Sequence, residues 1–344
     1  MKAKIQKIIL NGNGSYLGMQ KGCFIVKEGR EGNIRRYPMF ESEIGEIIIT
    51  SGNFISSSVL ASCGFWSIPI VVMTKNLKPI AVLRSLDDDE HIKTRLAQYE
   101  AIKNGKGIQI AKQIILSKIE SQNIILKKYS LRQIDLMTFK AKIQSLNSNN
   151  LKEVRKRLLP IEGKASEHYF AEIFKLFPKS LRIEKRKSFK AYDGINNTFN
   201  LAYTLLRYRV HSAILKAHLE PFLGFVHAEA HSKPALVCDM MEIYRSLIDN
   251  FIIEFSETLK PKDFILKTEW FSTNRLGKRQ VLNREKTKEL TERLNDYFER
   301  KVEIPRIRHG SKQTIETLIN EEAMLLGKYL RSEIPQWKPR IAIP

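Results

Sequence analysis

The stretch Ser85-Leu-Asp-Asp-Asp-Glu90 divides the sequence into two parts with different patterns. A serine followed by acids is typical of a helix start, because the hydroxyl caps backbone N–H groups and the carboxylates face the positive end of the helix dipole. Before this stretch, short apolar runs alternate with turn residues; after it, apolar residues recur at helical spacing to about residue 334. We therefore predict an α+β protein with a small β-rich domain, residues 1–85, and a large, mostly α-helical domain, residues 86–344.

The N-terminal part contains apolar and β-branched runs that predict strands at residues 4–10, 23–27, 46–50 and 68–73. The glycine-containing segments 11–14 and 28–32 predict hairpin turns. Between the last two runs, residues 56–63 predict a short helix that ends at Gly64, so this region should form a strand–helix–strand unit.

In the helical part, Pro, Gly and Asn predict breaks near residues 104–107, 147–150, 178, 193–197, 221–224, 261 and 274–277. The last ten residues include three prolines, and we expect residues 335–344 to form a loose tail.

The charge is strongly positive, and it lies almost entirely in the second part. Lys and Arg number 58 against 37 Asp and Glu, which gives a net charge of +21. The first ninety residues contribute 11 − 9 = +2, and the remainder contributes 47 − 28 = +19. Such a field suits a polyanion bound by the second part. Composition alone does not separate DNA, RNA and an anionic membrane, and a generally basic proteome is the simpler alternative.

Three widely separated cysteines, Cys23, Cys63 and Cys238, form neither a zinc-binding spacing nor a disulfide framework. We interpret them as packed thiols in a reducing cytoplasm. No apolar run approaches the roughly 20 residues that span a bilayer, and we see no signal-peptide pattern. The sequence therefore predicts a cytoplasmic protein that does not associate with membranes.

One candidate for chemistry is Glu162. Small or apolar residues share its helical stripe, namely Ala165, Ser166, Tyr169 and Ile173. Because the stripe should face inward, its carboxylate needs a cation or a metal ion. Pro160 suits the first turn of the helix, and Gly163 indicates that something approaches the backbone closely. An acid that serves only the helix dipole is the alternative.

A second segment joins a histidine to two acids. His227 lies in the turn before a predicted helix on which Asp239 and Glu242 share a polar stripe. The apolar face of that helix contains Leu236, Met240, Ile243 and Leu247. Two carboxylates and an imidazole are typical of a divalent-cation site, and the imidazole favours Mn²⁺ over Mg²⁺. The alternatives are an ion pair between Glu242 and Arg245 and a hydrogen-bonded core histidine.

Basic residues that could contact phosphate surround these segments. They are Lys164, Lys185, Arg186, Lys187, Arg207, Arg245, Lys278 and Arg279, with the last two placed in a loop near Gly277. Tyr169 is a candidate to stack on a base. A solvated face for the cations and a core position for the tyrosine are the alternatives.

Three motifs resemble the CRISPR-associated "protein one" family. They are Ile161-Glu-Gly-x-Ala-Ser-x-x-Tyr-Phe170; Pro221-x-Leu-Gly-Phe-Val-His227; and Ala235-Leu-Val-x-Asp-Met-Met-Glu242-x-Tyr-Arg245. The segments Arg95-x-x-Gln98-Tyr99 and Lys118-Ile-x-x-Gln122 also fit, as does the segment from Asp193 to Leu206. The resemblance runs from residue 1 to about residue 260; beyond Asn274 it is only to a basic helical tail.

The resemblance implies an integrase and endonuclease that inserts short DNA duplexes into a CRISPR array. It implies Mn²⁺ or Mg²⁺ ligands at Glu162, His227 and Glu242, with Asp239 as a supporting acid. The N-terminal domain would form a homodimer, and two such dimers would flank a dimer of the small ferredoxin-like "protein two". Double-stranded DNA, as spacer precursor and as CRISPR repeat, would be the substrate.

Three other functions remain open at this point. A casposase-type transposon integrase has the same chemistry, although residues 286–330 are short for its helix-turn-helix. A structure-specific repair nuclease would cleave branched DNA without integrating short duplexes. A nucleic-acid-binding scaffold with a dead site would bind no metal.

Overall fold

The computed structural model describes most of the chain. The described residues are 6–29, 33–39, 44–66, 68–75, 79–83, 85, 90–188, 191–228, 233–272, 275–302 and 313–341. The chain forms two compact units, residues 1–89 and 90–344, so the division falls close to the predicted one. The predicted helix start at Ser85 lies mostly outside the described residues.

The first unit is β-rich, as predicted, and its described strands form two four-stranded sheets. The first sheet has the order β1-β5-β7-β8, with β1 (Gln6–Leu10), β5 (Ile44–Thr50) and β7 (Ile70–Met73) parallel and β8 (Pro79–Leu83) antiparallel. The second has the order β4-β3-β2-β6 and consists of β4 (Ile34–Pro38), β3 (Cys23–Lys27), β2 (Tyr16–Gln20) and β6 (Phe54–Ile55). Apolar residues from both sheets, including Ile8, Leu17, Phe24 and Ile47, form one core.

The predicted strand–helix–strand unit is confirmed. Helix α1 (Ser57–Phe65) lies between the parallel strands β5 and β7 in sequence, and the Ser56 side chain caps it by accepting from Val59 N–H. The strands on either side of the predicted hairpin turn at 28–32, β3 and β4, pair antiparallel as expected, and residues 30–32 of the turn lie outside the described residues. The prediction at 11–14 is wrong, since β1 and β2 belong to different sheets. The missed hairpin joins β2 to β3 through Lys21 and Gly22, which both have positive φ.

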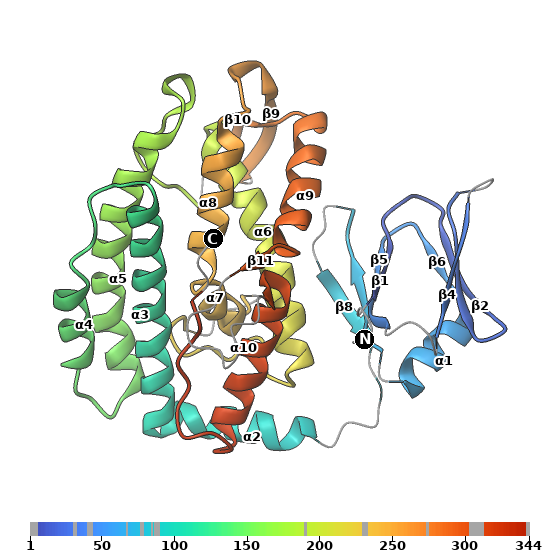
Figure 1. Cartoon of the computed structure of the whole chain (residues 1–344), viewed down its shortest axis with the longest axis horizontal. Coiled ribbons are helices and arrows are strands. Elements are labelled where there is room, and N and C mark those ends of the chain that lie inside the picture. Colours follow the sequence, from blue (N-terminus) through green and yellow to red (C-terminus); the bar gives the residue numbers. More distant parts are fainter. Residues whose placement is uncertain are drawn as a thin grey trace. The chain divides into compact units, whose positions relative to one another are not determined.

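The second unit is mostly helical, also as predicted (Figure 1). Its helices are α2 (Glu90–Lys103), α3 (Gly105–Lys128), α4 (Leu136–Gln144), α5 (Leu151–Ile173), α6 (Gly194–Lys216), α7 (Ala235–Met241), α8 (Arg245–Ser256), α9 (Arg284–Phe298) and α10 (Ile315–Leu330). Short 3₁₀ turns occur at Phe174–Leu176, Lys179–Leu181 and Pro261–Asp263. Several predicted breaks coincide with helix caps, since Asn104, Asn150 and Asp193 each accept a backbone N–H at a helix start.

Long helices form the frame that positions the candidate residues. Helix α3 packs against α5 and α8, and α6 packs against α7, α8 and α10. Buried residues such as Ile114, Leu158, Phe199 and Ile248 fill the space between them. In the described part of the chain, no helix is long and apolar enough to cross a membrane.

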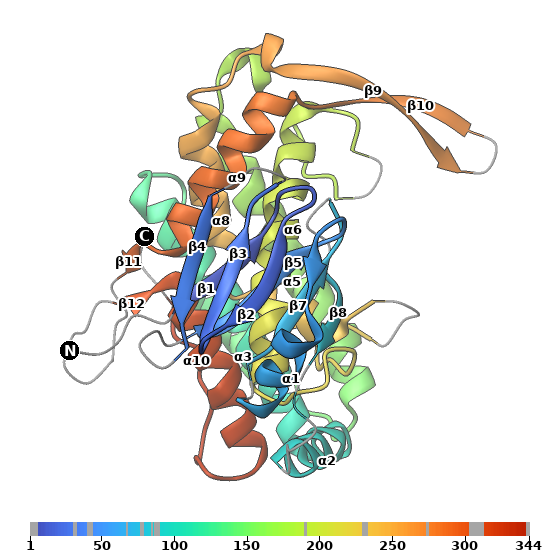
Figure 2. The same cartoon turned by 90° about the vertical axis from the view of Figure 1, so that its right-hand side faces the viewer.

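Two predictions for this unit are wrong. The chain is not helical throughout, because β9 (Phe264–Ser272) and β10 (Arg275–Leu282) form a hairpin that extends away from the helices (Figure 2). A second small ladder pairs β11 (Lys301–Val302) with β12 (Gln313–Thr314). The tail is not loose where it is described, because Trp337 is buried and Arg340 pairs with Glu321 and Glu322 of α10.

Candidate metal centre

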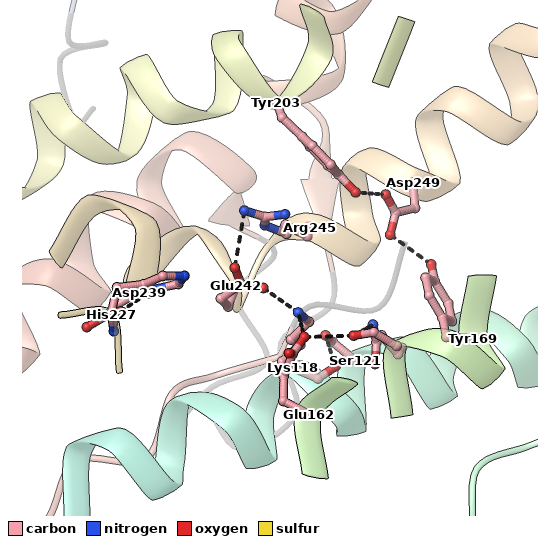
Figure 3. Close-up of polar contacts among 12 residues, drawn as sticks. Lys118, Ser121, Glu162, Tyr169, Tyr203, His227, Asp239, Glu242, Arg245 and Asp249 are labelled. Atoms are coloured by element: carbon pink, nitrogen blue, oxygen red, sulfur yellow. Dashed lines mark hydrogen bonds and ion pairs between the residues drawn. The ribbon is translucent and has the colours of Figure 1, made fainter. Parts of the chain in front are cut away.

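Glu162 lies at the middle of α5, with its side chain turned towards α3 (Figure 3). The predicted inward stripe is confirmed, since Ala165, Tyr169 and Ile173 are fully buried. The helix begins nine residues earlier than Pro160, at Leu151, so Pro160 is an internal residue and not part of the first turn. No described part of the protein lies within 4 Å of a Cβ placed on Gly163, so the close approach predicted for its backbone does not come from the chain itself.

Lys118 of α3 joins the two candidate glutamates. Its ammonium donates a hydrogen bond to Oε1 of Glu162 and forms an ion pair with Oε2 of Glu242 at 2.6 Å (Figure 3). Ser166 also donates to Oε1 of Glu162, at 2.8 Å. Burial by itself lowers the pKa of Lys118, but Glu242 and Glu162 outweigh it and raise that pKa above its ordinary value. The ammonium therefore stays charged between two carboxylates.

The helix is interrupted at Glu242, which the sequence did not predict. The predicted continuous helix is two helices, because α7 ends at Met241 and α8 begins at Arg245. Arg245 forms an ion pair with Oε1 of Glu242 at 3.1 Å, as the alternative interpretation held. Burial opposes ionisation of Glu242, but Arg245 and Lys118, with a smaller contribution from His227, hold its pKa at about 2.

Asp239 holds the loop that carries His227. Its carboxylate accepts backbone N–H groups from Phe225, Val226 and His227, the last two at 2.9 and 2.8 Å. A Cβ on Gly224 would lie 2.8 Å from Oδ2 of Asp239, so only glycine lets the loop pass this close. Nδ1 of His227 lies 2.7 Å from Oδ1 of Asp239. With Nδ1–H donating there, Nε2 is left with its lone pair available to accept a proton or bind a metal ion.

The donor set fits a divalent cation in its chemistry. Glu162 and Glu242 supply carboxylate oxygens, and His227 supplies an oriented imidazole nitrogen. Among the described residues, however, no three His, Cys, Asp or Glu side chains lie close enough together to hold a metal ion as they stand. Lys118 occupies the position between the two glutamates.

A second buried acid, Asp249 of α8, was not predicted. Tyr169 donates a hydrogen bond to its Oδ2 at 3.0 Å, and Tyr203 of α6 donates to its Oδ1 (Figure 3). Burial raises the pKa of Asp249 to about 6, although these hydrogen bonds and the nearby Arg186 and Arg245 oppose the shift. Asp249 thus fixes α5, α6 and α8 to one another.

A cavity of about 890 Å³ lies beside His227. Its basic lining residues are Lys103, Lys152, Arg155, Lys156 and Lys233, and no acid is among the described residues that line it. Arg155 donates to the carbonyl oxygens of Gly224 and Phe225, so it fixes the loop before His227. The sequence offered a signal in the four cations between positions 152 and 157, which we did not single out.

The residues predicted to contact DNA fall into three groups. Lys164, Lys185, Lys187, Arg207 and Lys278 are exposed. Arg186, Arg245 and Arg279 are partly buried; Arg186 bonds to Asn196 and Asn200, and Arg245 stacks over Tyr203. Lys278 and Arg279 lie in strand β10 and not in a loop. Tyr169 is fully buried against Asp249, so the prediction that it stacks on a base is wrong.

Structural comparison identifies several proteins with the same fold. A casposase bound to an integration product matches with a TM-score of 0.74 at 21% identity, over 97% of this chain and 93% of that one. A Cas1 protein from Thermotoga maritima matches with a TM-score of 0.70 at 21% identity, over 94% and 97%. A Cas6-RT-Cas1–Cas2 complex matches with a TM-score of 0.71 at 18% identity, over 98% of this chain and 36% of that one.

Sequence comparison identifies the family. The chain is 28% identical over 261 residues to the CRISPR-associated endonuclease Cas1 2 of Pyrobaculum aerophilum, covering 76% of this chain and 86% of the relative. It is 26% identical over 275 residues to the CRISPR-associated endonuclease Cas1 of Korarchaeum cryptofilum, covering 75% and 80%. The sequence model of the family described as "CRISPR associated protein Cas1" matches residues 8–293 of this chain. The chain therefore belongs to the Cas1 family.

Proposed function

We propose that this chain is a metal-dependent DNA endonuclease and integrase of CRISPR adaptation. Relatives whose sequences align with about three quarters of this chain are named CRISPR-associated endonucleases. Proteins with the same fold include a casposase bound to its integration product and a Cas1–Cas2 complex. The proposed reaction joins the 3′-hydroxyl ends of short duplex DNA to a CRISPR array.

One observation supports this function most strongly. Glu162 and Glu242, which are far apart in sequence and belong to different segments, bind the same cationic group. His227 is oriented by Asp239 and contributes to the electrostatics of Glu242. Carboxylates and an imidazole around one cation are the donor set that a nuclease needs to neutralise charge at a phosphate.

We propose that Glu162, Glu242 and Nε2 of His227 hold Mn²⁺ or Mg²⁺. When bound, such an ion polarises the scissile phosphoryl group and offsets the negative charge that develops on it. Asp239 keeps the imidazole of His227 in one tautomer and one orientation. Arg245 keeps Glu242 ionised and in place, because the pair is largely buried.

The proposed reaction balances without an external energy source. One phosphorus–oxygen bond forms at the incoming 3′ oxygen, whose proton is lost, while one phosphorus–oxygen bond of the array strand breaks and its oxygen gains a proton. The number of phosphodiester bonds does not change. With water in place of the 3′-hydroxyl, the same geometry hydrolyses DNA, and the remaining contribution of the protein is positioning.

The basic second unit supports DNA as the substrate. The cavity beside His227 is lined by Lys103, Lys152, Lys156 and Lys233, whose charges can follow a phosphate backbone next to the metal centre. We propose that the exposed candidates Lys164 and Lys185 extend this surface. A homodimer built on the first unit and the small ferredoxin-like "protein two" complete the proposed assembly.

The proposal is tested with the protein, its small partner, a short duplex and a supercoiled array plasmid in Mn²⁺. We expect Glu162→Ala, His227→Ala and Glu242→Ala each to abolish joining while DNA affinity stays within a few-fold. Glu167→Ala, which removes an exposed acid from the same helix, is the matched control and should join normally. Metal-dependent joining by any of the three variants would refute the ligand assignment.

The DNA surface is tested separately by fluorescence anisotropy at several salt concentrations. Lys152→Gln with Lys156→Gln should weaken DNA binding and reduce the salt slope, because each lost phosphate contact lowers it by about 1. Lys127→Gln with Lys140→Gln removes the same charge from exposed positions outside the cavity. Equal effects of the two double variants would show that only net charge matters.

A casposase-type integrase is the second candidate, because its fold matches over almost the whole chain. The two functions differ in the DNA end that is joined. Preference for the terminal repeats of a transposon over short duplexes without them would favour the casposase activity.

A further inference from the structure

Lys118 is the cation between the two proposed ligands of the metal. It lies on α3 with only 7% of its surface exposed, bonded to Glu162 and 2.6 Å from Oε2 of Glu242. A buried ammonium is unfavourable unless it is paired, and Lys118 forms ion pairs with these two carboxylates. The site is therefore electrostatically satisfied before any metal binds.

The ammonium and a divalent ion need the same oxygen atoms. A carboxylate oxygen lies about 2.0–2.1 Å from Mg²⁺ and about 2.7–2.9 Å from an ammonium nitrogen, so the two cations would occupy overlapping positions. The other partners leave this position to Lys118 in different ways: Ser166 shares Oε1 of Glu162 with it, whereas Arg245 pairs with Oε1 of Glu242, the oxygen that Lys118 does not bind. The two carboxylates are thus arranged around an ammonium, and no three of the described side chains form a ready metal site.

We propose that Lys118 substitutes internally for the divalent cation and must withdraw from between Glu162 and Glu242 when metal binds. The inference rests on the proposed metal-dependent function. Lys118 keeps the two acids close and neutralised in the metal-free protein, and it weakens metal binding by competing for their oxygens. Its flexible four-carbon stem allows the ammonium to leave without movement of α3.

The test measures metal binding and not activity. Mn²⁺ is titrated into the full-length protein, and the free ion is followed by electron paramagnetic resonance. Lys118→Met keeps the length of the side chain without its charge, and we expect its Kd for Mn²⁺ to be about 10-fold lower or more. The metal-free variant should have a lower Tm than the wild type, and Mn²⁺ should raise that Tm more than it raises the wild-type value.

Two further variants separate competition from a general loss of charge. Lys128→Met removes a lysine of the same helix that pairs with Glu254, and it should leave the Kd within about twofold. Lys118→Arg offers the acids a fork of several donors, so it should weaken Mn²⁺ binding. Opposite changes in Lys118→Met and Lys118→Arg are the expected signature.

The outcomes separate this inference from the proposed function. If the wild type binds Mn²⁺ and Lys118→Met binds it no more tightly, Lys118 does not compete and the inference fails alone. Weaker binding by both Lys118 variants would mean that Lys118 helps to build the site, which also overturns it. Absence of Mn²⁺ binding in both wild type and Lys118→Met would overturn the metal assignment together with the inference.

Discussion

Two kinds of acid lie within the same helical unit and are held in opposite ways. The bridged acids, Glu162 and Glu242, are paired with cations, and the pKa of Glu242 is held at about 2. The anchoring acids, Asp239 and Asp249, accept hydrogen bonds from the loop before α7 and from two tyrosines, and the pKa of Asp249 is raised to about 6.

This difference separates acids that can exchange one cation for another from acids that hold the structure in place. A carboxylate that is paired with a long, flexible cation can exchange that cation for another one. A carboxylate whose oxygens are satisfied by fixed N–H and O–H donors cannot move without leaving those donors unpaired. We therefore expect the bridged acids to tolerate replacement in the folded structure and the anchoring acids to be needed for it.

The largest expected effect comes from Asp239→Ala. The backbone N–H groups of Phe225 and Val226 would lose their acceptor inside the protein, and the free energy of unfolding should fall by about 3–5 kcal/mol. Glu162→Ala should cost about 1 kcal/mol or less, because Lys118 keeps Glu242 as a partner. Urea unfolding followed by far-UV circular dichroism measures both.

The two variants together test whether the bridged acids also support the fold. Equal losses for Asp239→Ala and Glu162→Ala would show that the bridged acids also serve the fold. Asp239→Asn keeps one carbonyl oxygen as acceptor and should fall between wild type and Asp239→Ala. A larger loss of unfolding free energy for Asp239→Asn than for Asp239→Ala would contradict the anchoring role.

The next effect is a loss of stability with rising pH, expected for the anchoring acid Asp249. The folded-state pKa of Asp249 is about 6, above its ordinary value of 3.8, because burial disfavours the charged form. Protonated Asp249 contributes favourably to the free energy of unfolding, and this contribution is complete below pH 3.8. It is lost as the pH rises through 6, by about 3 kcal/mol in total. The stability of wild type relative to Asp249→Asn should therefore decrease from pH 4 to pH 7.

Urea unfolding at four pH values in this range measures the trend. Asp296→Asn, an exposed position on α9, is the control, and its difference from wild type should stay nearly constant. If the difference for Asp249→Asn were also constant with pH, Asp249 would not be a strained buried acid.

The sequence predicted the elements that local patterns control. Strand runs, helix breaks and the stripe around Glu162 depend on neighbouring residues, and the structure contains them. The β9–β10 hairpin was missed, although the segment Phe264–Ser272 is rich in aromatic and β-branched residues. Helical spacing on both sides of it led us to expect a helix there.

The site was predicted less completely, because its contacts span long distances in sequence. Lys118 and Glu162 are 44 residues apart, and no local sequence pattern indicates that they form a hydrogen bond. One signal was available, since Lys118 lies on the same inward stripe of α3 as Ile114, Ile115 and Ile125. A lysine on such a stripe requires a buried acid, and the identity of that acid comes only from the packing of α3 against α5 and α8.

The smallest expected effect tests the anchoring network through one of its donors. Tyr169→Phe removes the hydrogen bond to Oδ2 of Asp249 and should lower the free energy of unfolding by about 1–2 kcal/mol, because the bond is buried while Tyr203 still donates. DNA affinity, measured by anisotropy, should not change, since the ring of Tyr169 never reaches the surface. Weaker DNA binding without a loss of stability would restore the stacking role that burial excludes. A loss of stability without a loss of DNA binding would show that Tyr169 supports the fold together with the anchoring acids. The bridged acids would then remain the candidates for metal binding and catalysis.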